Sequence, residues 1–150
     1  MPQIDPAQLP DLPVAFMNAD HAREVQLVND VEAALDAHGR GEGTLEHVVE
    51  RLSLLAVHTR EHFLREEAMM RETRFPAYPV HRAEHDRFLA EMDAEVRSLR
   101  ERGDGSGLAR YLSEKLPAWF LNHIGTMDAV TARFVAGQGL EGQALGGQGR

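Results

Sequence analysis

The stretch from His58 to His85 constrains the fold of this chain most, because it carries metal-ligand side chains at helical spacing in two consecutive segments. His62 and Glu66 are four residues apart, and so are His81 and His85. Residues four apart lie on one face of an α-helix, one turn above each other. The proline-containing segment TRFPAYP separates the two pairs. Two antiparallel helices joined there would bring both pairs together, as in a metal site inside a helical bundle.

Four segments show apolar residues at every third or fourth position, which predicts four amphipathic helices. We expect them over residues 14–38, 44–72, 79–102 and 108–136. Thr44 is a good N-cap for the second helix, and Pro117 predicts a kink or a break in the fourth. No strand-like alternation competes with these patterns. The sequence therefore predicts an all-α protein, an up-down-up-down four-helix bundle.

Both ends of the chain are predicted to lie outside the helices. Residues 1–13 contain four prolines, which exclude a continuous helix, so we expect an extended N-terminal arm. Residues 137–150 are rich in Gly and Gln, and we expect them to form a flexible tail. A length of 150 residues suits a single domain, which we place at residues 1–136.

Composition narrows the classes of site and partner. The chain has no cysteine, which excludes disulfides, thiolate–zinc sites, iron–sulfur clusters and cysteine nucleophiles. Its net charge of −8 with neutral histidines argues against nucleic-acid binding through the phosphate backbone. The sequence shows no secretory signal and no apolar run of about 20 residues. We therefore expect a cytoplasmic protein with no membrane span and no nucleic-acid partner.

Seven polar side chains interrupt or adjoin the apolar faces of the predicted helices. They are His21, His62, Glu66, His81, His85, His123 and Asp128. Burying so many unpaired imidazoles and carboxylates would be costly, whereas bound cations would give each lone pair a partner. One metal ion takes about 4–6 ligands, so seven ligands with two carboxylates able to bridge suit two ions. In an up-down-up-down bundle all seven fall in one layer at one end.

One spacing in this set does not place both residues on the same face of a regular α-helix. His123 and Asp128 are five residues apart, which is about 140° around a straight α-helix. Asp128 must therefore reach around the helix, or the helix must widen by a π-bulge. Gly125 lies between them and would ease either solution.

Other polar residues near these motifs are expected to have simpler roles. Glu67 is predicted to be a solvated neighbour of Glu66, and His38 and His47 to be capping or solvent-exposed groups at helix ends. His58 lies one turn before the first ligand pair. We expect it to support the site or to line an access route, without being a ligand itself.

Three motifs in combination resemble the hemerythrin family, and specifically the single-domain bacterial hemerythrins (bacteriohemerythrins). They read His62-Phe63-Leu64-Arg65-Glu66-Glu67-Ala68-Met69, then His81 to Phe88, then Trp119 to Asp128. The resemblance extends from about Ala15 to Phe134. Each motif alone is weak, whereas their combination is specific.

The resemblance implies a four-helix bundle with a non-haem di-iron centre that binds dioxygen reversibly. It implies that three histidines bind one iron, namely His81, His85 and His123. His21 and His62 would bind the other iron, which keeps an open place for oxygen. Glu66 and Asp128 would bridge the two irons, together with an oxo or hydroxo group.

We interpret the chain as a non-enzymatic oxygen carrier, store or sensor, with dioxygen as its ligand, that acts as a monomer or weak homo-oligomer. A sensor would need a separate protein partner. One alternative is a di-iron oxidase, a peroxidase-like protein or a nitric-oxide-handling protein. The ligand set disfavours this alternative, because ferritin-like di-iron carboxylate proteins use four glutamates and two histidines. Another alternative is an iron-handling stress protein.

Overall fold

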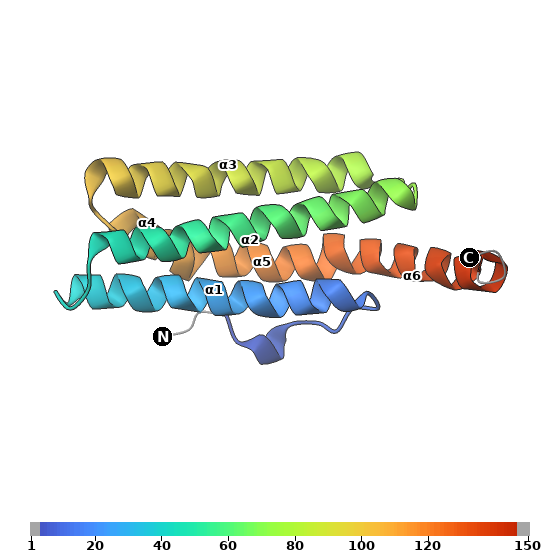
Figure 1. Cartoon of the computed structure of the whole chain (residues 1–150), viewed down its shortest axis with the longest axis horizontal. Coiled ribbons are helices and arrows are strands. Elements are labelled where there is room, and N and C mark those ends of the chain that lie inside the picture. The colour runs from blue at the N-terminus through green and yellow to red at the C-terminus, as the bar shows by residue number, and fades with distance from the viewer. Residues whose placement is uncertain (1–3, 147–150) are drawn as a thin grey trace.

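A computed structural model of the chain describes residues 4–146, and residues 139–146 by their backbone alone. Four long helical segments pack side by side in alternating directions (Figure 1), so the predicted all-α, up-down-up-down bundle is confirmed. The first three segments are α1 (Ala15–Gly39), α2 (Leu45–Glu72) and α3 (Tyr78–Arg102). The fourth consists of α4 (Ser106–Arg110), η2 (Tyr111–Lys115), α5 (Leu116–His123), η3 (Ile124–Asp128) and α6 (Ala129–Gly146).

The helix ends follow local sequence signals. Thr44 caps α2, because its hydroxyl oxygen accepts the backbone N–H of His47 at 3.1 Å. Pro79 lies in the first turn of α3, where its missing N–H costs nothing. Gly103 ends α3 in the left-handed conformation, with φ of 65°, which glycine adopts without steric cost. These positions fix the short turns that make consecutive helices antiparallel.

Apolar side chains fill the interior of the bundle away from its ligand-bearing end. Fully buried examples from three helical segments are Val25, Val28, Leu52, Leu55, Met92 and Leu99. Burial of this apolar surface is the main favourable term that holds amphipathic helices together. Within residues 4–146, none of the helices combines the length and the apolar character that a membrane span requires.

Two wide turns interrupt the fourth helical segment. The first, η2, is a π-helical turn that ends just before Pro117, and Pro117 lies in the first turn of α5. A proline has no N–H to donate to the carbonyl four residues earlier. The hydrogen-bond register shifts before it, so that the Leu116 N–H donates to the Tyr111 carbonyl, five residues back. The predicted break at Pro117 therefore takes the form of a widened turn in a continuing helix.

The N-terminal arm lies against α1. Its described part is mostly extended, with one short 3-10 turn, η1 (Pro6–Gln8), that Asp5 caps. Ile4 and Leu12 are buried. Asn18 of α1 fixes the arm, because its side chain accepts from the Leu12 N–H at 2.9 Å and donates to the Leu12 carbonyl at 2.8 Å.

The fourth helical segment continues past residue 136, where the sequence predicts its end. The backbone of α6 stays helical to Gly146 and extends past the neighbouring helices (Figure 1). Most residues of the segment LEGQAL, which lies between glycines, favour helix formation, and this explains the continuation. Residues 1–3 of the predicted arm and 147–150 of the predicted tail lie outside the described residues. The domain boundary at residue 136 stays a prediction.

The Thr44 cap generates a test of the fold. Thr44→Ala removes the acceptor for the His47 N–H and is expected to lower the free energy of unfolding by about 1 kcal/mol. Thr44→Ser keeps the acceptor and should cost a few tenths of that amount. Urea denaturation followed by circular dichroism measures both. Equal stability of the alanine and serine variants would contradict the cap.

Candidate metal centre

All seven predicted ligand residues meet in one buried layer at one end of the bundle. Each is at most 3% exposed. They come from α1, α2, α3, α5 and η3, and they are His21, His62, Glu66, His81, His85, His123 and Asp128. The early turns of α1 and α3 lie beside the late turns of α2 and the fourth segment (Figure 1). The alternating helix directions therefore bring together residues that are up to 107 positions apart.

The seven side chains form two overlapping groups of potential ligand atoms. In each group the nitrogen and oxygen atoms lie within 4.8 Å of one another. The first group is Glu66, His81, His85, His123 and Asp128. The second group is His21, His62, Glu66 and Asp128. Two carboxylates thus belong to both groups, whereas each histidine belongs to only one.

Each shared carboxylate turns one oxygen toward each group. Glu66 Oε1 lies 3.2 Å from His85 Nε2, whereas Glu66 Oε2 lies 2.8 Å from His62 Nε2. Asp128 Oδ1 lies 3.0 Å from His81 Nε2, and Asp128 Oδ2 lies 2.9 Å from His21 Nε2. This is the orientation that two bridging carboxylates require.

Several buried atoms in this layer make no well-aligned hydrogen bond, although atoms of the opposite ligand type lie 2.8–3.2 Å away. They are both carboxylate oxygens of Glu66, Oδ1 of Asp128 and Nε2 of His85. Buried polar atoms are rarely left unsatisfied, and these four point into the same small volume. Imidazole nitrogen and carboxylate oxygen are ligands for divalent transition metals. The donor set therefore fits bound metal ions, which would give the orphaned atoms their partners.

A π-helical turn places Asp128 in the layer. η3 covers Ile124–Asp128, and the Ala129 N–H donates to the Ile124 carbonyl, five residues back. In such a turn residues five apart return to nearly the same face. His123 Nε2 and Asp128 Oδ1 consequently lie 3.1 Å apart. Of the two sequence-based solutions for this spacing, the widened helix is the one observed.

Four of the five histidines are held by a hydrogen bond at the second ring nitrogen. The Nδ1 atoms of three of them contact carboxylates: His62 contacts Asp20 at 2.9 Å, His85 contacts Glu67 at 2.9 Å and His123 contacts Glu84 at 2.7 Å. His81 Nδ1 lies 2.8 Å from the hydroxyl of Thr131. Such partners fix the ring orientation and direct the Nε2 lone pair inward.

Sequence reasoning missed these outer partners. Glu67 is 6% exposed and bonded to His85, so its expected role as a solvated neighbour is wrong. A signal was available, because Asp20, Glu67 and Glu84 each stand next to a predicted ligand in the sequence. Neighbouring positions on a helix point about 100° apart. The acidic residue next to one ligand therefore faces the histidine of an adjacent helix.

Aromatic rings cover the histidines on the apolar side of the layer. Phe63 stacks on His85, with ring centroids 3.7 Å apart and planes 1° apart. Trp119 stacks on His123 at 4.5 Å. Phe120 meets His21 edge-on at 6.0 Å. These rings restrict both the rotation of the imidazoles and the access of water.

Protons and carboxylates balance each other in the metal-free layer. Burial opposes a charged His62, but the Glu66 charge and the close contacts with Asp20 and Glu66 raise the pKa of His62 to about 10. Burial also opposes a charged Asp128, but its close contacts with three histidine rings hold the pKa of Asp128 well below its usual range. Protons on imidazole thus compensate the carboxylates in this state, and a metal ion that binds must displace them.

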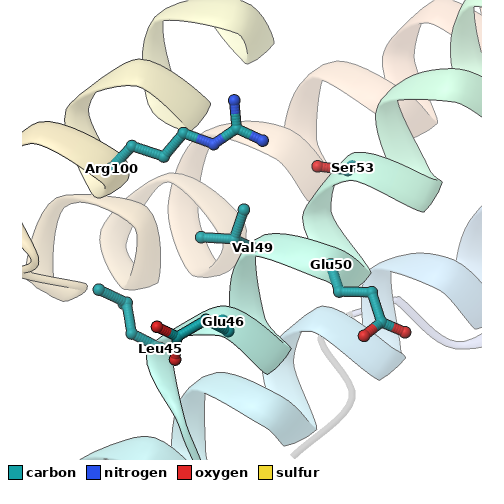
Figure 2. Close-up of a pocket in the computed structure, with 6 residues that line it drawn as sticks. All are labelled: Leu45, Glu46, Val49, Glu50, Ser53 and Arg100. Atoms are coloured by element: carbon teal, nitrogen blue, oxygen red, sulfur yellow. The ribbon is translucent and has the colours of Figure 1, made fainter.

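A surface groove of about 440 Å³ lies at the other end of α2. Figure 2 shows its lining side chains, among them Arg100 from α3 above Val49 from α2. Val49 is 13 residues from His62 along α2, about 20 Å at helical rise. The groove is therefore separate from the histidine layer, and it contains none of the predicted ligands.

Comparison with known proteins gives a consistent result. The family model described as "Hemerythrin HHE cation binding domain" matches residues 12–135. A bacteriohemerythrin of Ralstonia nicotianae is 34% identical over 139 residues, which cover 93% of each chain. A bacteriohemerythrin of Aquifex aeolicus is 29% identical over 79% of this chain and 86% of its own length. The myohemerythrin of Sipunculus nudus is 33% identical over 52% of this chain and 58% of its own. No solved structure gives a significant match.

The outer carboxylates generate a test of the metal centre. Glu84→Gln weakens the contact to His123 Nδ1 and is expected to lower metal affinity 10- to 100-fold. Glu91→Gln changes an exposed glutamate of the same helix and should leave affinity unchanged. Competition with a chromophoric chelator measures both. Equal affinities for the two variants would contradict the orienting role of Glu84.

The proton on His62 predicts a pH dependence of metal-free stability. Because the pKa of His62 is about 10 in the folded chain, against 6.5 for an unperturbed histidine, the folded state alone holds this proton between those values. Its stabilisation is complete below pH 6.5 and is lost as the pH rises toward 10. Because the folded state binds one more proton than the unfolded state in this range, the free energy of unfolding should fall by about 1.4 kcal/mol per pH unit. His62→Gln should remove this slope from denaturation curves of chelator-treated protein, and parallel pH profiles for the two proteins would refute it.

Proposed function

Since the chain belongs to the hemerythrin family, we propose that its histidine layer holds two iron ions and binds dioxygen reversibly. The observation that carries this proposal is the pair of carboxylates whose oxygens divide between two groups of histidines. A site for a single metal ion would not require two carboxylates that each face both groups of histidines. Iron suits the mixture of imidazole and carboxylate ligands.

The two groups of histidines are unequal, which supports one open coordination position. Three histidines face one proposed iron: His81, His85 and His123. Only His21 and His62 face the other. If Glu66 and Asp128 were shared by both irons, the second iron would have one protein ligand fewer, and we assign that position to dioxygen. Bound iron would supply the electrons that dioxygen takes up on binding and returns on release.

The surroundings favour binding over turnover. Phe120 and Phe63 place apolar rings beside His21 and His62, and a dry apolar pocket slows the entry of water and protons. Five of the seven ligands are imidazoles, which are neutral when they bind a metal. We therefore retain the carrier, store or sensor role over the oxidase, peroxidase-like, nitric-oxide-handling and iron-handling stress-protein alternatives. The cytoplasmic location and the monomeric or weakly associating state stay predictions.

Anaerobic loading with ferrous iron tests this function. We expect two irons per chain and a visible absorption band that appears in oxygen and disappears when oxygen is removed by argon. Glu66→Ala removes a carboxylate shared by both groups, so it should lower the iron content and abolish the band. Glu50→Ala, an exposed change on the same helix, is the control. Binding of a single iron, or direct irreversible oxidation on the first exposure, would count against the proposal.

A further inference from the structure

A buried glutamate lies one helical turn from the histidine layer and has no role in it. Glu24 follows His21 by three residues on α1 and is only 4% exposed. Its partner Thr59 precedes His62 by three residues on α2 and is fully buried. Three residues span about 5 Å along a helix. Glu24 and Thr59 therefore form the next layer of the bundle, beside the two-histidine side of the metal centre.

The contacts of Thr59 favour a protonated Glu24. The Thr59 hydroxyl contacts two oxygens, Oε1 of Glu24 and the carbonyl of Leu55, the latter at 2.8 Å. The hydroxyl has one hydrogen, and the carbonyl can only accept. If the hydroxyl donates to Leu55, the hydrogen between Thr59 and Glu24 must come from Glu24. A neutral carboxylic acid satisfies both contacts, whereas a carboxylate leaves one of them between two acceptors.

His58 connects Glu24 to the surface. Its Nε2 donates to the backbone carbonyl of Asp20 at 3.1 Å, so the hydrogen is on this nitrogen. The same Nε2 lies 3.3 Å from Oε2 of Glu24, an oxygen with no hydrogen-bond partner of its own. The His58 side chain is 16% exposed. One imidazole thus reaches from solvent to the buried carboxyl group.

We propose that Glu24 is a neutral carboxylic acid that supplies protons to the two-histidine side of the metal centre and is reprotonated from solvent through His58. This inference rests on the proposed function, because it needs oxygen to be reduced there. Burial raises the pKa of Glu24 to about 7, in agreement with the hydrogen count. The titratable groups that face it are Asp20 of α1, His62 and Glu66 of α2, Tyr111 of η2 and, by direct contact, His58 of α2.

The proton supply affects how long iron stays ferrous in air. Oxidation of the two ferrous ions by oxygen, with release of hydrogen peroxide, is 2 Fe²⁺ + O₂ + 2 H⁺ → 2 Fe³⁺ + H₂O₂. This reaction consumes two protons. One proton would pass from the Glu24 carboxyl to the oxygen as it is reduced. His58 replaces it from Nε2 while Nδ1 takes a proton from water, and exchange with water then restores the Nε2–H form. A second passage supplies the second proton, so Glu24 gives this otherwise apolar site a slow route to hydrogen peroxide.

Infrared spectroscopy and oxidation kinetics test the two parts of the proposal. In metal-free protein at pH 5.5, Glu24→Gln should remove a carbonyl band of a protonated carboxylic acid. In iron-loaded protein it should slow oxidation by air at least tenfold, since general acids contribute about 10²–10⁴ in rate, and should reduce the slowing by heavy water. The matched control is Glu32→Gln. Glu32 is also a buried glutamate of α1, at 8% exposure, but lies eight positions further from the layer, so its variant should oxidise at the wild-type rate.

Two results would overturn the inference: loss of an ionised carboxylate band in Glu24→Gln, or an unchanged oxidation rate. His58→Gln gives a second measurement that leaves Glu24 in place. It should keep the acid band and still slow oxidation, and a wild-type rate there would refute the route through His58. Failure of the proposed function is distinguishable from these results. A protein without a reversible oxygen band still oxidises in air, and the infrared band needs no metal.

Discussion

Two carboxylates and five imidazoles, almost completely removed from solvent at one end of a helical bundle, impose the constraint on which the rest of this structure depends. Ionised groups at such depth are tolerated only when opposite charges or metal ions compensate them. In the metal-free state protons on the imidazoles provide that compensation, as the raised pKa of His62 indicates. A pair of divalent cations would provide it more fully, because each orphaned oxygen of Glu66 would gain a partner.

Several local departures from regular helix structure follow from this constraint. The π-helical turn η3 loses regular α-helical hydrogen bonds, but it brings Asp128 onto the face of His123. The outer carboxylates of Asp20, Glu67 and Glu84 lie at the edge of the layer and orient the imidazoles. The histidine layer is therefore bordered by acidic residues that belong to neither group of potential ligands.

The same environment gives Glu24 its properties. Aromatic rings keep the surroundings of the histidines apolar, which would suit the proposed reversible binding of oxygen. Glu24 and Thr59 place one neutral acid in that apolar region, and His58 connects it to solvent. The balance between holding oxygen and losing it as peroxide would then depend on one buried proton. Whether the protein acts as an oxygen carrier or as a slow oxidase would then depend on proton transfer from Glu24.

The sequence by itself determined the helices and the seven residues that meet in the site, because helical periodicity and i, i+4 spacing are local properties. Alternating helix directions then sufficed to predict that His21, His62, His81 and His123 share one layer. The choice between a reaching Asp128 and a widened helix needed the fold, since only the positions of the other ligands decide it. The partners of the histidines were also beyond local patterns: Glu67 contacts His85 of the next helix, and Glu24 has a raised pKa because it is buried between helices, where it contacts Thr59 and His58. Hydrogen bonds between helices depend on side-chain directions that only tertiary packing fixes.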